Sequence, residues 1–200
     1  MKKLFTFIFL AICSLQSFAT VRTASVTGNW NSTTTWGGTV PAANDDVVIN
    51  AGVTVTINVN PANINNVTVN GTLQFDATGT ARTWTINQAL TVNSGGSFIC
   101  QAPGTATTHT LNYNGTSIAN NGTFNMRSGS NVCNITIGGA STQTIGGNNA
   151  ITFNKLTLNN TGGKFQIDYA SGGFTPTEIN PTKLNVSITT NDSLVIKQGL

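Results

Sequence analysis

The stretch from Asn66 to Phe75, NVTVNGTLQF, carries the pattern that decides the fold. Two valines alternate with polar residues, the pair Asn70-Gly71 marks a tight turn, and the alternation resumes at Leu73. Because successive side chains of a strand point to opposite faces, each half of the stretch hides one apolar row. The stretch therefore predicts two short strands joined by a tight corner.

This unit of row, corner and row recurs along the chain. The first apolar residue after each turn gives the series Val53, Leu73, Phe98, Phe124, Ile145, Phe165 and Leu194, with spacings of 20 to 29 residues. A loose period of this size is typical of a solenoid. We therefore expect an all-β, right-handed, single-stranded parallel β-helix of about seven coils, in which these residues form successive core layers. An antiparallel sandwich is the alternative, because its turn signals also recur at short intervals.

The composition narrows the classes of function. Charged residues make up only 8% of the chain, against roughly 25% in ordinary globular proteins. Asn, Thr, Ser and Gly must therefore cover most of the surface. Such a surface does not favour nucleic-acid binding, which relies on clustered Lys and Arg.

The first 19 residues have the pattern of a secretory signal peptide. Lys2 and Lys3 form a positive start, an apolar run follows, and Ser17-Phe18-Ala19 is a small-x-small cleavage site. The apolar run is shorter than the ~20 residues that span a bilayer, so a membrane anchor is the weaker interpretation. We expect a secreted or cell-surface protein that does not span the membrane once the leader is removed. The mature chain then has seven basic and six acidic residues, or about +1.

Residues 20–45 precede the regular repeats and contain Trp30 and Trp36. The open end of a solenoid exposes strand edges and apolar core, so terminal units tend to be atypical caps. We expect these two indoles to close that end. The alternative function for them is a ligand-binding platform on which sugars stack. From residue 46 to residue 200 the rows continue, and we expect one uninterrupted β-helix.

The opening of the repeats resembles the start of the eight-glycine domain, over roughly Gly28 to Cys100. The resemblance rests on Trp36, Gly37, Gly38, Val40, Pro41, Asp46, Val48, Gly52, Val53, Gly71, Leu73, Gly95 and Gly96. It implies a β-rich, helix-poor fold in a secreted or cell-surface protein. The chain also looks like the opening of large, repetitive, adhesin-like bacterial surface proteins. Some animal members of the eight-glycine group act on hyaluronan, but we find no matching catalytic cluster in this sequence.

The acidic residues are few, and only Asp45 and Asp46 are adjacent. Their simplest role is an Asx-type turn that starts a strand. The alternative is a calcium site completed by backbone carbonyls, which would make calcium the one possible cofactor. No Ser or Cys nucleophile pattern accompanies the single histidine, His109, so we expect it to be an ordinary strand residue rather than part of a triad or zinc site.

Cys100 and Cys133 are the cysteines of the mature chain. Both share the parity of apolar neighbours, so we expect both to face the core. Export permits a disulfide. They fall at different points of different coils, however, which favours buried free thiols.

These patterns predict an exported, non-catalytic β-helix module, adhesin-like or structural, whose partner is extracellular polysaccharide or a cell-surface glycan. An enzyme acting on polysaccharide is the alternative. An ice-binding protein is the third reading, suggested by the pairs Thr54/Thr56, Thr83/Thr85 and Thr142/Thr144. The last row, from Leu194, is followed by no polar cap before Leu200, so we expect the solenoid to continue in a longer protein or to be completed by a partner.

Overall fold

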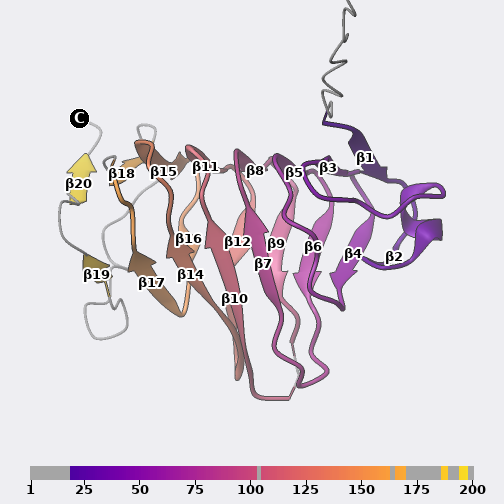
Figure 1. Cartoon of the computed structure of the whole chain (residues 1–200). Helices are drawn as coiled ribbons and strands as arrows, with labels where there is room; N and C mark the ends of the chain where they lie inside the picture. Colours follow the sequence, from indigo (N-terminus) through magenta and orange to yellow (C-terminus); the bar gives the residue numbers. More distant parts are fainter. Residues whose placement is uncertain (1–18, 103–104, 163–164, 170–185, 189–193, 198–200) are drawn as a thin grey trace, which may run out of the picture.

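A computed structural model describes residues 19–102, 105–162, 165–169, 186–188 and 194–197. These residues form an all-β parallel solenoid of about five turns, fewer than the seven coils expected from the sequence. The strands of successive turns lie side by side along one axis (Figure 1). Residues 170–185, most of the leader and the end of the chain lie outside the described residues.

Three sheets run along the solenoid. Sheet A follows the order β1 (Val21–Ala24), β3 (Asp46–Ile49), β5 (Val67–Val69), β8 (Leu90–Val92), β11 (Ser117–Asn120), β15 (Gln143–Gly147), β18 (Phe165–Tyr169) and β20 (Leu194–Lys197). Sheet B follows the order β2 (Gly28–Asn29), β4 (Thr54–Ile57), β6 (Thr72–Phe75), β9 (Ser97–Cys100), β12 (Thr123–Asn125) and β16 (Ile151–Thr152). Sheet C follows the order β7 (Thr83–Ile86), β10 (Thr107–Tyr113), β14 (Asn131–Ile137), β17 (Lys155–Leu158) and β19 (Val186–Ile188), with the short β13 (Arg127–Ser128) beside β14.

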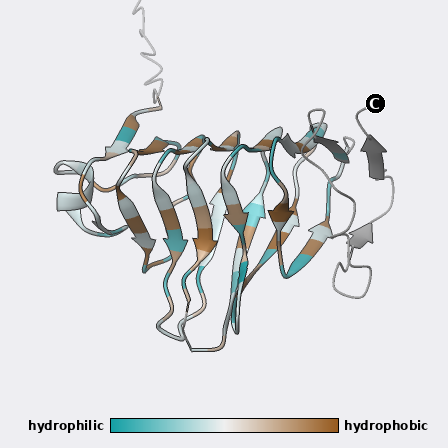
Figure 2. Ribbon diagram, turned by 180° about the vertical axis from the view of Figure 1, so that it is seen from behind, coloured by the Kyte–Doolittle hydropathy of each residue, from teal (hydrophilic) through white to brown (hydrophobic). Residues whose placement is uncertain are grey.

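The strand pairs along the three sheets are parallel, which confirms the β-helix against the sandwich. The antiparallel pair among the described strands is the two-residue β13 with β14. Hydrophobic segments recur on the strands from one end of the stack to the other (Figure 2). Residues of like character occupy the same position in successive turns, as in the ladder Leu73, Phe98 and Phe124 of sheet B.

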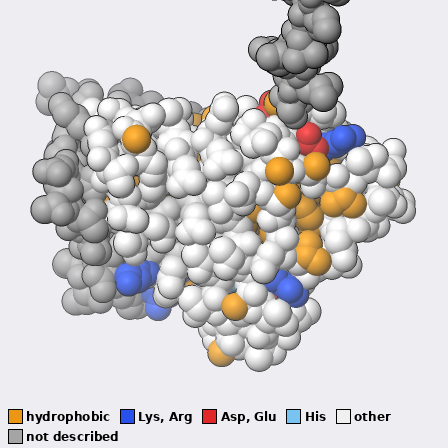
Figure 3. All heavy atoms as spheres, viewed as in Figure 1, with side chains coloured by type: hydrophobic (Ala, Val, Ile, Leu, Met, Phe, Trp, Pro, Cys, Tyr) orange, Lys and Arg blue, Asp and Glu red, His pale blue; other side chains and the backbone are white. Residues whose placement is uncertain are grey.

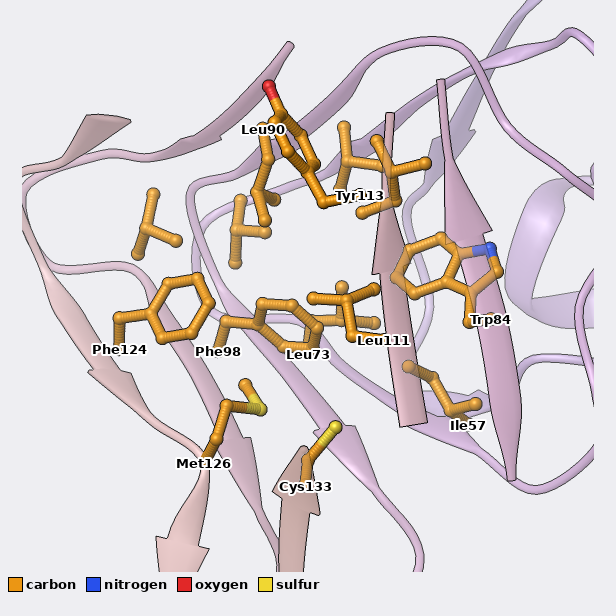
Figure 4. Packing of buried hydrophobic residues seen from close by; sticks show 14 of the residues in the cluster. Ile57, Leu73, Trp84, Leu90, Phe98, Leu111, Tyr113, Phe124, Met126 and Cys133 are labelled. Atoms are coloured by element: carbon orange, nitrogen blue, oxygen red, sulfur yellow. The ribbon is translucent and has the colours of Figure 1, made fainter. Parts of the chain in front are cut away.

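The core is continuous and aromatic in its middle. Phe98 lies between Phe75 and Phe124, with ring centroids 5.9 Å and 5.2 Å apart. Trp84 meets Phe98 edge to face at 6.2 Å. Side chains from all three sheets meet in this space (Figure 4). Burying such rings stabilises the stack, since an aromatic pair adds about 0.5–1.5 kcal/mol beyond the area that it removes from water.

The layer series expected from the sequence is correct for Leu73, Phe98 and Phe124, which are partners on sheet B. Val53 directly precedes β4, but the partner of Leu73 on that strand is Val55. Phe124, however, pairs with Ile151 and not with Ile145, which pairs with Ile118 on sheet A. The reason is that turns differ in length, so a series counted along the chain moves from one sheet to the next.

Sheet A passes to sheet B through what we call the tight corner, residues 70–71, 93–96 and 121–122. Glycines of successive turns approach the backbone of the preceding turn here. A Cβ added to Gly71, Gly96 or Gly122 would lie less than 3.0 Å from a backbone oxygen of that turn. Asn93 also donates its side-chain amide to Asn70 at 2.8 Å. The close stacking of the turns therefore explains why glycine and asparagine occupy this corner.

Sheet B passes to sheet C through the wide corner, whose described residues are 76–82, 101–102, 105–106 and 126–130. These connections are longer and differ from turn to turn. They project beyond the rest of the solenoid at the lower edge of Figure 1. Polar side chains, described below, fill the interior of this corner.

The N-terminal segment forms the expected cap together with a first partial turn. Strands β1 and β2 pair with β3 and β4, and a 3₁₀ turn, η1 (Thr33–Trp36), follows them. Gly37 ends this turn in the left-handed conformation, with φ at 67°. No α-helix occurs among the described residues.

Candidate functional site

Trp30 and Trp36 close the N-terminal end of the core. Their side chains are buried, and their ring centroids lie 5.0 Å apart in an edge-to-face arrangement. The indole Nε1 of Trp36 donates to the carbonyl oxygen of Trp30 at 2.6 Å, and Trp84 packs against Trp30 at 5.1 Å. Both rings are therefore enclosed by protein. This geometry supports the cap and leaves no ring face on which a sugar can stack.

Asp45 and Asp46 lie at the start of β3, and their carboxylates have different partners. Asp45 Oδ2 accepts from the backbone N–H of Ala42 at 2.9 Å and from Arg22 Nε at 3.0 Å. Asp46 Oδ1 accepts from the side chain of Asn66 at 2.8 Å and from its backbone N–H at 3.1 Å. Asp45 therefore closes a turn back to Ala42, three residues earlier, and not the expected Asx turn, which would use a backbone N–H two residues later.

The carboxyl group of Asp45 is held in its charged form. Burial alone would raise its pKa, but hydrogen bonds from Ala42 and Arg22 outweigh that effect, and the pKa is lowered from its ordinary value. The Arg22 guanidinium supplies the positive charge opposite the Asp45 carboxylate that a bound cation would otherwise supply. Within the described residues, no group of three His, Cys, Asp or Glu side chains is arranged to hold a metal ion.

The wide corner encloses a cluster of ionisable and amide side chains that the sequence did not reveal. Asp76 forms an ion pair with Arg82, with Oδ2 and the guanidinium nitrogen 2.6 Å apart, and accepts from the Thr78 hydroxyl at 3.0 Å. Asn131 donates to the backbone carbonyls of Asp76 and Gln101 at 3.0 Å and 2.9 Å. We call Asp76, Arg82, His109 and Asn131 the corner network.

His109 lies at the centre of the corner network. Its ring stacks on Phe75 with centroids 4.7 Å apart, and the residue is fully buried. The backbone N–H of Arg82 donates to Nδ1 at 3.0 Å, and Nε2 lies 2.9 Å from Asn131 Oδ1. Since Nδ1 accepts, the proton resides on Nε2 and the imidazole is neutral. Burial lowers the pKa of His109 below its ordinary value.

The corner network contains a carboxylate, a guanidinium and an imidazole. Their spacing in the sequence does not indicate that they lie close together. Asp76 and His109 are separated by 33 residues of sequence. Both are buried, and the contacts above satisfy their hydrogen-bonding atoms. Buried polar groups with complete partners fix one packing of a core. We therefore assign the corner network a structural role.

Cys100 and Cys133 are free and buried, as expected from their parity. Burial raises the pKa of Cys100 to about 12 and raises that of Cys133 well above its ordinary value. A thiol at neutral pH is then almost entirely protonated, and the protonated form is a poor nucleophile.

The outward positions of sheet C form two columns of uncharged polar side chains with one lysine. One column contains Thr83, Thr110, Asn134 and Lys155, and the other contains Thr85, Asn112, Thr136 and Thr157. We call these eight residues the sheet C face. Neighbouring strands lie about 4.8 Å apart and alternate residues about 6.8 Å apart, so the columns form a regular grid of hydrogen-bonding groups. Uncharged atoms cover most of the surface in Figure 3, where charged side chains occur in only a few places.

The expected Thr-x-Thr pairs do not assemble into one array. Thr54/Thr56 belong to β4 of sheet B, and Thr83/Thr85 belong to β7 of sheet C. Thr144 belongs to β15 of sheet A. The three pairs therefore face in different directions. In addition, none of the helices among the described residues is long and apolar enough to cross a membrane.

The G8 domain model matches residues 35–185 of this chain. No curated protein and no solved structure matches it. The match begins at the capping segment and continues through the turns of all three sheets, well beyond the part in which the resemblance was noted from the sequence. Since it covers more than half of the 200 residues, the protein belongs to the G8 domain family.

Proposed function

We propose that this chain is an exported, non-catalytic module of an adhesin-like or structural surface protein, and that it binds neutral extracellular polysaccharide through the sheet C face. The observation that carries the proposal is the pair of aligned columns on that face. They offer hydroxyl and amide groups at fixed spacing, with Lys155 as their one charged member. A regular, uncharged, hydroxyl-rich polymer has complementary hydrogen-bonding groups.

The placement of Asp45, Asp46 and Asp76, three of the six acidic side chains, supports a binding role. Asp45 and Asp76 are ion-paired to arginines, and Asp46 accepts two hydrogen bonds from Asn66. General acid or base catalysis requires a carboxyl group that can reach its substrate. The sheet C face carries hydroxyl and amide groups and one lysine, and none of its eight residues is acidic. Binding is thus the activity that its chemistry favours.

The proposal is tested with a panel of insoluble and soluble polysaccharides, neutral and anionic. We expect the mature protein to be retained by at least one neutral polysaccharide. Retention should fall at least tenfold when Asn112 or Thr136 is replaced by glutamate. Binding would remove water from the new carboxylate, and a neutral sugar provides no opposite charge to offset that cost. Thr123→Glu places the same charge at an exposed position of β12 on sheet B and serves as the matched control.

Two results would overturn this function. One is the absence of retention by every neutral polysaccharide in the panel. The other is retention that Thr123→Glu abolishes and that Asn112→Glu leaves unchanged, which would move the contact to sheet B. Export itself is measured separately, from the location of the chain in the producing cells and from the removal of the leader.

The enzymatic alternative predicts turnover. Depolymerisation of any panel member that disappears with Asp46→Ala would establish it and contradict a purely binding role. The ice-binding alternative predicts thermal hysteresis. The separation of the Thr-x-Thr pairs onto three sheets argues against it, and we expect no hysteresis.

A further inference from the structure

The start of β1 lies against the ion pair of Asp45 and Arg22. The carbonyl oxygen of Thr20 accepts from the backbone N–H of Asp46 at 2.9 Å. The β1–β3 register, in which Val21 is the partner of Asp46, places Thr20 beside Asp45, and the Thr20 backbone N–H helps to lower the pKa of that carboxyl group. Thr20 is exposed, and it is the residue that follows the cleavage site Ser17-Phe18-Ala19.

We propose that the bond between Ala19 and Thr20 is a processing site, and that cleavage there creates an α-ammonium group that binds the Asp45 carboxylate and fastens β1 to the solenoid. The inference rests on the export that we propose above. A leader peptidase adds water across the amide bond. The carbonyl carbon of Ala19 becomes a carboxylate on the released leader, and the nitrogen of Thr20 becomes the ammonium group.

The charges at this site favour the processed chain. Arg22 carries one positive charge, whereas Asp45 and Asp46 carry two negative charges between them. Before cleavage, the Thr20 nitrogen is a neutral amide, and the site has one negative charge in excess. After cleavage, the ammonium group balances it. The ammonium group can form a charge-assisted hydrogen bond to Asp45, which is roughly twice as strong as one from a neutral amide.

The position of this contact gives it a structural consequence. β1 is the outer strand of sheet A at the N-terminal end and pairs with β3 along one edge. The strand has only four residues, and Val21 is 58% exposed. Short edge strands open easily because they are held from one side. An ammonium group on Asp45 holds the first residue of the chain at the point where fraying would begin. Figure 3 shows acidic and basic side chains gathered at this end of the molecule.

The first test is the N-terminal sequence of the exported protein. We expect Thr20 as the first residue, and a mature chain that starts elsewhere would overturn the proposal. The second test compares chains that begin at Thr20, with the amine free or acetylated, and a chain that begins at Ala19. The free amine should raise the thermal midpoint by about 1–3 °C over the other two, since exposed ion pairs are worth little in a chain of this size. It should also slow hydrogen exchange in β1 several-fold.

Two backgrounds show whether the effect passes through Asp45. In Asp45→Asn the three chains should have equal midpoints, whereas in Asp46→Asn, the matched control, the difference should persist. If Asp45→Asn does not fold, the salt dependence of the free-amine effect replaces it, and an effect that 1 M salt leaves unchanged would overturn the ion pair. A chain that begins Met-Thr20 and loses its methionine in the cytoplasm supplies the free amine without export. A failure of export therefore contradicts the proposed function, whereas equal midpoints contradict the ion pair.

Discussion

Two of the three corners of each turn, the tight corner and the wide corner, reverse the chain by different means. The tight corner turns the chain within two to four residues and relies on glycine, because backbone from the next turn fills the place of a side chain. The wide corner uses longer connections and encloses the corner network. The tight corner packs closely because its glycines have no side chains. The wide corner is stabilised by a few buried side chains with several hydrogen-bond partners each.

This difference has an energetic consequence. At the tight corner a substitution introduces a steric conflict with the neighbouring turn, whereas at the wide corner it leaves buried polar atoms without partners. Both are recognised causes of large destabilisation. Substitutions of exposed residues near either corner should change the free energy of unfolding much less. The predictions below test this ranking.

The largest effect is expected for Gly96→Ala at the tight corner. Its Cβ would lie less than 3.0 Å from the backbone oxygen atom of Val69 in the preceding turn, so the turns must separate. We expect a loss of about 4 kcal/mol in the free energy of unfolding, measured by denaturant titration. Gly95→Ala is the matched control. Its Cβ meets nothing within 4 Å, but its φ of 82° strains any other residue, by about 1 kcal/mol. Equal losses for the two variants would contradict the stacking.

Next in size is Asn131→Leu at the wide corner. The change keeps the volume but removes the acceptor of His109 Nε2 and the donor to two carbonyls. Since each buried atom left unsatisfied costs about 1–3 kcal/mol, we expect a loss of roughly 3 kcal/mol. Asn134→Ala removes an outward amide on the same strand, and should change stability by less than about 1 kcal/mol. A similar loss in both would show that the network adds nothing.

The corner network should also make stability depend on pH. His109 is neutral in the folded protein and its pKa is lowered, so the unfolded chain binds more protons below the ordinary pKa of 6.5. Stability is therefore complete above that pH and is lost as the pH falls below it, by at most about 1.4 kcal/mol per unit for one proton. Unfolding titrations at pH 7 and pH 5 measure this. His109→Gln should abolish the difference, and a variant that keeps it would assign the protonation to another group.

The smallest effect concerns the two thiols, which lie on the sheets that meet at the wide corner. With both buried and both pKa values raised, a thiol reagent should modify neither Cys100 nor Cys133 of the mature folded protein within the time that it modifies both in denaturant. Mass spectrometry after alkylation measures this. Rapid modification of either thiol in the native protein would show that the core opens at this corner.

The tight corner explains why so much of the fold could be predicted from the sequence. Alternating rows and Asn-Gly turns are local signals, and they identified the strands, the parallel solenoid and the N-terminal cap. The partner of Phe124 in the next turn, Ile151, was missed because turn length varies, and no local signal records how many residues a wide corner takes. The corner network was missed for the same reason. His109, Asp76 and Asn131 belong to three different strands or connections, and only the register of the turns brings them together.

The central claim about this fold is the register of the stacked turns, and a pair of engineered cysteines can test it. Asn125 and Thr152 are partners on adjacent strands of sheet B, with both side chains outward. Partners in adjacent strands lie close to the 4.4–6.8 Å between Cα atoms that a disulfide needs. The structure predicts that Asn125→Cys with Thr152→Cys forms a disulfide on mild oxidation and that Asn125→Cys with Gly146→Cys does not. The opposite outcome would restore the layer series read from the sequence and contradict the three-sheet register.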